Sequence, residues 1–303
     1  MIQEAQMQMM QKVMIPSVKQ YDFFNEYMVR RRQRLIRNNK NWLAIAVGGT
    51  GDGKSWTAAR ECEYIDPNFI NNIKEFGIKS VVAFGKAQDY LKMIDSGIED
   101  HILKRGSMCM FDEAGVGVPS REWYKEQNKD FSYVSQTFRN LNIGTIFTTP
   151  DISFIDSQPR KLFHDYQKAI KVIIEKKVVV IQPLVMENNP RMGKIYYKYP
   201  FFHGIQIRRL YVGKPSQIFI NEYEPAKDVF NNTLRKESIK AGDKAEHEKE
   251  KRRQSDDDRL ERLAAVGIPV SDTPSASAFL GCDRQIIYRL QRRQKLKNEG
   301  ILK

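Results

Sequence analysis

The chain has 303 residues, 41% of them hydrophobic, three scattered cysteines and a formal net charge of +13. These values fit one sizeable core with a small second module, and they argue against a disulfide framework. The sequence contains no run of about eighteen apolar residues and no signal-peptide pattern, so we expect a cytoplasmic protein without stable membrane insertion. The positive charge favours a polyanionic partner such as nucleic acid.

Residues 1–40 are expected to form an N-terminal helical, basic region. The stretch "YMVRRRQRLIRNNK" holds six basic residues from Arg30 to Lys40 and no acidic one. This basic collar suits a contact with nucleic acid or with a neighbouring subunit, and it equally suits the solvated face of a helix.

Residues 41–223 are expected to form an α/β core. Short apolar runs at 43–47, 80–84, 108–111 and 143–148 alternate with helical segments, a pattern that predicts a parallel central sheet covered on both faces. Between 166 and 220, β-rich runs flank the turn "ENNPRMG", which predicts an antiparallel β extension. The predicted fold class is therefore α/β, a parallel central sheet with such an extension and a small helical C-terminal module.

The segment "GGTGDGKS", residues 48–55, matches GxxxxGK[ST] and stands between a predicted strand and a predicted helix. It is hereafter called the P-loop, and it makes the predicted fold class that of a P-loop NTPase. Its glycines allow backbone N–H groups to face the phosphates of ATP, and the helix N-terminus adds partial positive charge. Lys54 would reach the β- and γ-phosphates, and the Ser55 hydroxyl would bind Mg²⁺. The predicted nucleotide-binding residues are Gly48, Gly49, Thr50, Gly51, Asp52, Gly53, Lys54, Ser55 and Trp56.

Two adjacent acids follow the apolar run in "SMCMFDEAG". Asp112 is the candidate second metal ligand, and Glu113 is the candidate that polarises the attacking water. An Asp-Glu pair can also cap a following helix, but the upstream P-loop favours the catalytic interpretation. The paired acids, together with the lack of an NKxD motif, indicate ATP hydrolysis rather than a GTPase switch.

The strand predicted at 143–148 ends in a threonine pair. Thr149 is the candidate that contacts the γ-phosphate or the lytic water, although a threonine there can simply cap the strand. Arg139 and Arg160 could each reach a neighbour's site as an arginine finger, or each could form a surface salt bridge. Glu113, Lys54, Arg139 and Thr149 are the predicted catalytic residues.

The order of these motifs resembles the FtsK/HerA class of P-loop ATPases. Within it, "GTIFTTPDISFID" followed by an arginine is most similar to the zonula-occludens-toxin-like ATPases of filamentous phages and mobile elements; the resemblance covers residues 41–163. It implies a homo-oligomeric ring, such as a hexamer, that moves DNA or an assembling virion, with viral or mobile-element assembly proteins as partners. It also matches Arg139 to the arginine that precedes the last core strand.

Beyond a charged helical linker at 224–263, residues 264–303 are expected to form a helix-turn-helix-like module. Ala276, Phe279 and Leu280 would be buried, Gly281 would form the turn, and the second helix would bury Ile286, Ile287 and Leu290. The motif resembles excisionase and MerR-type DNA readers; a helical hairpin for protein contacts is the alternative. The predicted DNA-binding residues are Arg284, Gln285, Tyr288, Arg289 and Arg292.

These features together predict an ATP-hydrolysing DNA translocase for genome packaging or DNA transfer, acting in the host cytoplasm if the chain is viral. Two alternatives stay open. One is an ATPase that extrudes filamentous virions, which the lack of an apolar span disfavours. The other is a replication or regulatory protein that binds DNA and uses ATP as an assembly switch.

Overall fold

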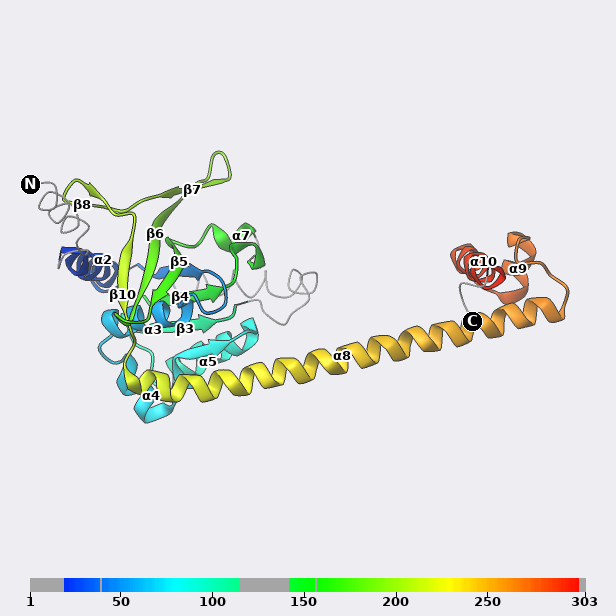
Figure 1. Ribbon diagram of the computed structural model, residues 1–303, viewed down its shortest axis with the longest axis horizontal. Helices are drawn as coiled ribbons and strands as arrows, with labels where there is room; N and C mark the ends of the chain where they lie inside the picture. The colour runs from blue at the N-terminus through cyan, green and yellow to red at the C-terminus, as the bar shows by residue number, and fades with distance from the viewer. Residues whose placement is uncertain (1–18, 39, 115–141, 156, 300–303) are drawn as a thin grey trace, which may run out of the picture. The chain divides into compact units, whose positions relative to one another are not determined.

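The computed structural model describes residues 19–38, 40–114, 142–155 and 157–299 (Figure 1). The chain divides into two compact units, residues 1–231 and 232–303. Helix α8 (Gln217–Ala265) begins in the first unit and ends in the second. Among the described helices, none combines the length and the apolar character that crossing a lipid bilayer requires.

The first unit is built on a sheet with a parallel centre and an antiparallel extension (Figure 1). β5, β1, β4, β3 and β2 are parallel neighbours in that order, and β6, β7 and β10 continue the sheet by antiparallel pairing. The predicted fold class is therefore confirmed. The strands are β1 (Trp42–Val47), β2 (Val82–Phe84), β3 (Met108–Asp112), β4 (Gly144–Thr149), β5 (Asp165–Ile173), β6 (Val178–Asn189), β7 (Lys194–Lys198) and β10 (Leu210–Gly213), with β8 (Phe201–Phe202) and β9 (Ile205–Gln206) in a separate two-stranded sheet.

The four apolar runs found in the sequence become β1 to β4. Every residue of these four strands is buried, as expected for parallel strands covered on both faces. β2 begins at Val82 rather than at residue 80, because Ile78–Ser80 form a 3-10 turn in which the Ser80 N–H bonds the carbonyl of Gly77.

Helices of the first unit pack on this sheet. Tyr27, Met28 and Leu35 of α2 and Ala58 and Cys62 of α3 are all fully buried in one continuous core. The helices are α2 (Lys19–Ile36), α3 (Lys54–Ile65), α4 (Phe69–Phe76), α5 (Ala87–Glu99) and α7 (Ser157–Arg160), with 3-10 turns η1 (Ile78–Ser80) and η2 (Ile152–Phe154).

Half of the basic collar on α2 is engaged in contacts within the chain. The Arg31 guanidinium pairs with Asp165 at the start of β5, and Arg34 Nε donates to the carbonyl of Asn41 at 2.9 Å. Arg30 bonds Glu26 at 2.7 Å. Arg32, Arg37 and Lys40 are exposed, so these three are the collar residues available to a partner.

The first turns of α8 belong to the core of the first unit. Phe219 stacks on Phe69, and Tyr223 and Phe230 both pack on Phe84 with ring centroids 5.8 and 5.5 Å apart. The charged linker predicted at 224–263 lies within this helix, and Ala226 and Phe230 near its start pack in part against the core. Aromatic side chains spaced at 219, 223 and 230 give this charged helix one apolar stripe.

The second unit has its own small core. Leu263 at the end of α8, Ala276 of α9 (Thr273–Leu280), and Ile287 and Leu290 of α10 (Arg284–Asn298) are fully buried. The side chains of Asp272 and Asp283 cap the starts of the two helices.

Gly281 ends α9 with φ 61°, as expected for the residue at the turn. Phe279, expected in the core, is instead 39% exposed, and the guanidinium of Arg262 lies 6.0 Å from its ring.

A buried carboxylate lies between α3 and β5. Gln167 Nε2 donates to both oxygens of Glu61, at 3.0 and 2.8 Å, and Glu61 is fully buried. Burial raises the pKa of Glu61 from 4.5 to about 8. Gln167 Oε1 is buried and has no hydrogen-bond partner among the described residues.

Glu61 makes the stability of the fold depend on pH. Between pH 4.5 and about 8 the folded state binds more protons at this group than the unfolded state, so its contribution is fully present below 4.5 and is lost as pH rises to about 8. The loss is roughly 3 to 5 kcal/mol. We expect Glu61→Gln, whose amide can donate to Gln167 Oε1, to raise the urea midpoint at pH 8 and to flatten this dependence. Exposed Glu75→Gln is the control, and equal pH slopes in Glu61→Gln and wild type would contradict the prediction.

Candidate functional site

The P-loop lies between β1 and α3, at the carboxyl end of a central strand. β1 ends at Val47, and α3 begins at Lys54. Gly53 has φ 88°, and a Cβ on it would lie 2.6 Å from Val179 Cγ2 of β6. Both the backbone conformation and the close approach of β6 therefore require glycine at this position.

Hydrogen bonds within the P-loop stabilise its turn conformation. Lys54 Nζ donates to the carbonyl of Gly49 at 2.8 Å, and the Gly49 N–H donates to Asp52 Oδ2 at 2.6 Å. Lys54 is buried, whereas Gly49, Thr50 and Gly51 are exposed. The exposed turn is the part of the loop that a nucleotide could approach. The remaining predicted residues, Gly48, Asp52, Gly53, Ser55 and Trp56, are half-buried.

Ser55 and Asp112 meet although they are 57 residues apart. Ser55 Oγ donates to Asp112 Oδ1 at 2.8 Å, and Asp112, the last residue of β3, is fully buried. The predicted pair of metal ligands is thus brought together by the sheet. One hydroxyl and one carboxylate fit Mg²⁺, which in nucleotide sites takes few protein ligands and completes its shell with phosphates and water. The described residues contain no cluster of three or more His, Cys, Asp or Glu that could hold a metal by itself.

Thr148, rather than Thr149, contacts the acidic pair Asp112 and Glu113, hereafter the Walker B pair. Thr148 Oγ1 donates to Asp112 Oδ1 at 2.6 Å and accepts from the Glu113 N–H at 3.0 Å. Thr149 Oγ1 instead donates to the carbonyl of Asp151 at 3.2 Å. The sequence predicts a polar strand end. Successive side chains of a strand point to opposite faces of the sheet, so only one of the two threonines can lie on the same face as the Asp112 carboxylate.

Glu113 adopts an uncommon backbone conformation. Its φ is 52°, in the left-handed region that non-glycine residues rarely occupy. The Thr148 hydroxyl holds its N–H in this position. Strained residues of this kind are concentrated at functional sites.

Two side chains of α8 complete the surroundings of the Walker B pair, and no sequence motif points to them. The Tyr223 hydroxyl donates to Asp112 Oδ2 at 2.6 Å. Lys227 Nζ lies 2.7 Å from the same oxygen and 3.1 Å from Glu113 Oε1. The available signal is weak, because Tyr223 and Lys227 lie four residues apart on one face of a helix whose tertiary position the sequence does not give.

Both α8 side chains donate hydrogen bonds at neutral pH. Burial by itself would lower the pKa of Lys227, but the attraction of Asp112 and Glu113 outweighs it and raises that pKa. Burial, together with the nearby charge of Asp112, raises the pKa of Tyr223 well above its ordinary value. Lys227 is therefore an ammonium ion, and Tyr223 is a neutral phenol.

The two candidate arginine fingers have different outcomes. Arg139 and the neighbouring Gln136 lie outside the described residues. Arg160, at the end of α7, donates from Nε to the carbonyl of Ile155 at 2.6 Å. In this structure Arg160 therefore stabilises the connection that follows β4.

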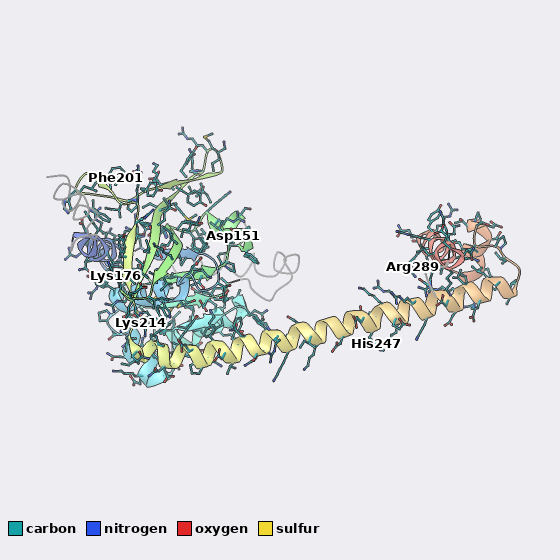
Figure 2. All side chains as sticks on the ribbon, viewed as in Figure 1. Asp151, Lys176, Phe201, Lys214, His247 and Arg289 are labelled. Carbon is teal, nitrogen blue, oxygen red and sulfur yellow. The ribbon has the colours of Figure 1, made fainter. Side chains whose placement is uncertain are left out.

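The five predicted DNA-contacting residues all lie exposed on α10. Arg289, labelled in Figure 2, is also paired within the chain, because its Nε and Nη2 donate to the carboxylate of Asp256 at 2.9 and 2.6 Å. Arg293 makes a similar two-bond contact with Asp257. Arg284, Gln285, Tyr288 and Arg292 lie exposed on the same helix.

Neither protein-family models nor curated proteins give a match to this chain. Similar solved structures include the N-terminal domain of zonular occludens toxin from Neisseria meningitidis, at 15% identity and TM-score 0.34, covering 54% of this chain and 96% of that one. The DNA-packaging ATPase of Sulfolobus turreted icosahedral virus aligns at 12% identity and TM-score 0.25, covering 54% and 100%. A KaiC-like protein from Pyrococcus horikoshii aligns at 11% identity and TM-score 0.27, covering 53% of this chain and 90% of that one. Similarity at this level carries no information on substrate or partner, which must come from this chain's residues.

The two neighbouring threonines can be told apart by substitution. We expect Thr148→Val to weaken Mg²⁺-dependent ATP binding by about 10- to 100-fold, because Asp112 loses a donor that orients it. Thr149→Val, which removes a contact to a loop carbonyl, should bind ATP as wild type does. Titration with a fluorescent ATP analogue, with and without Mg²⁺, measures both. A loss of binding in Thr149→Val alone would assign the role to the other threonine.

Proposed function

We propose that this chain hydrolyses ATP with Mg²⁺ and uses the energy to move DNA, as a homo-oligomeric motor for genome packaging or transfer. The observation that carries the ATPase part is the convergence of the P-loop with the Walker B pair, with Ser55 Oγ 2.8 Å from Asp112 Oδ1. These two segments are distant in sequence, and each contributes a group that phosphoryl transfer needs.

Each residue has a role that follows from its position. The Lys54 ammonium, now on the carbonyl of Gly49, would move to the phosphates of ATP. Ser55 and Asp112 would hold Mg²⁺, which when bound neutralises charge on the phosphate oxygens. Glu113, adjacent to Asp112, would orient the attacking water and accept its proton. Arg139 would act on the site of a neighbouring subunit, as the sequence resemblance implies.

Two basic surfaces support DNA as the partner. Residues 188–221 include six Lys or Arg and no acidic residue. Within that stretch Tyr196, Tyr197 and Phe201 are 42–57% exposed, with Phe201 labelled in Figure 2. Exposed rings between basic side chains favour nucleic acid, because bases can stack on the rings while the cations contact phosphates. The basic face of α10 is the second surface.

The motor hypothesis is tested by ATPase activity with and without duplex DNA. We expect DNA to stimulate the wild-type rate of hydrolysis severalfold. Lys54→Ala should lower that rate by at least about 100-fold, because the substitution removes a cation from the phosphates. Displacement of a triplex strand would then report movement along the duplex. An ATPase rate that is indifferent to DNA would favour the alternative of an assembly switch.

The role of α10 is tested by removing two of its exposed cations. We expect Arg284→Ala with Arg292→Ala to weaken DNA binding and to lower the salt dependence by about one unit of slope per lost phosphate contact. Arg289→Ala should in addition lower the melting temperature, because Asp256, only 4% exposed, loses its bidentate partner. Binding isotherms at several salt concentrations and thermal melts separate these effects. An unchanged salt slope in the double variant would assign α10 to protein contacts.

A further inference from the structure

The carboxylate of Asp112 is surrounded by four hydrogen-bond donors. Ser55 and Thr148 donate to Oδ1, and Tyr223 and Lys227 donate to Oδ2, all within 2.6–2.8 Å. Three of the four are neutral hydroxyls. Lys227 is the single cation among them, and its Nζ also contacts Glu113. Its ammonium thus bridges both acids of the Walker B pair.

Lys227 reaches the site from α8, which is packed on the core close to the site but lies far from the P-loop and β3 in sequence. The rings of Tyr223 and Phe230 anchor this part of α8 on Phe84. Pro225, between Tyr223 and Lys227, has no N–H and removes one backbone hydrogen bond from the helix there. The Lys227 side chain is 21% exposed, so solvent lies on one side of it. Its ammonium can leave the carboxylates by rotation of a long side chain while the aromatic anchors stay in place.

We propose that Lys227 is a positioning residue for the Walker B pair and competes with Mg²⁺ for it, so that the ammonium leaves Asp112 and Glu113 when Mg²⁺ and nucleotide bind. This inference rests on the ATP site of the proposed function. A cation held at Asp112 by Ser55 would lie close to the Lys227 ammonium, and like charges at such short range repel, the more strongly because Asp112 is fully buried. Glu113, once released, is free to accept a hydrogen bond from water.

The competition has a consequence for α8. The same helix continues into the second unit. Binding of Mg²⁺ and nucleotide would therefore change the contacts of a side chain on the helix that the two units share. Reciprocity requires that any partner that pulls Lys227 off the Walker B pair also raises the affinity for Mg²⁺ and nucleotide.

Lysine labelling of the wild-type chain tests the displacement directly. The intact protein is treated briefly with acetic anhydride, with and without Mg²⁺ and a non-hydrolysable ATP analogue, and acetylation is quantified by mass spectrometry. We expect labelling of Lys227 to rise on the order of severalfold. Exposed Lys236, on the same helix, is the matched control and should not change. Unchanged or reduced labelling of Lys227 would overturn the proposal, whether or not any variant folds.

Variants supply the second test. We expect Lys227→Met to lower by about tenfold the Mg²⁺ concentration for half-maximal binding of a fluorescent non-hydrolysable ATP analogue. Lys227→Arg should keep the wild-type midpoint, and Lys236→Met is the control. A merely structural lysine would lower the melting temperature and leave the midpoint unchanged; a lysine that holds phosphate would weaken binding. Either result contradicts competition.

These measurements contain no DNA, so their failure and that of the motor hypothesis are distinguishable. Unaltered Mg²⁺ midpoints with DNA-stimulated hydrolysis would overturn only the role of Lys227. An analogue that does not bind to wild type at all would overturn both the ATP site and this inference.

Discussion

The candidate site depends on how one buried negative charge is compensated. Asp112 is fully buried at the end of β3, where an uncompensated carboxylate would be costly. Four donors from three segments converge on it: Ser55 at the end of the P-loop, Thr148 of β4, and Tyr223 and Lys227 of α8. Because the donors are fixed by three different parts of the fold, the sheet, the loop and the helix must all be in place for the carboxylate to be satisfied.

This dependence connects the chemistry to the architecture. β3 and β4 are parallel neighbours, and their register places the Thr148 hydroxyl beside the Walker B pair. β1 lies between β4 and β5 and runs parallel to both, so the P-loop that follows it lies at the same carboxyl end of the sheet as the Walker B pair. The antiparallel β6 packs Val179 against Gly53, and so the β extension also shapes the loop. The extension is therefore part of the nucleotide site's framework as well as a surface.

Charge has separate uses in different parts of this basic chain. Arg31 and Arg289 are each committed to a carboxylate of the same chain, Asp165 and Asp256, and stabilise their own units. Exposed cations on α10, in residues 188–221 and in the basic collar could instead meet a polyanion. The net charge of +13 is therefore a weaker guide to the partner than the number of Lys and Arg side chains that are not paired with a carboxylate of the same chain.

The sequence by itself determined the elements whose signals are local. The P-loop, the buried strands β1 to β4 and the acids at 112 and 113 follow from short patterns, because phosphate binding needs glycines at fixed spacing and buried parallel strands need continuous apolar residues. Only the tertiary structure decided which threonine faces the carboxylate, since that depends on the register between β3 and β4. It also decided that Tyr223 and Lys227 belong to the site, because α8, which begins at Gln217, far beyond β4 in sequence, reaches Asp112 only once its aromatic side chains pack on the core.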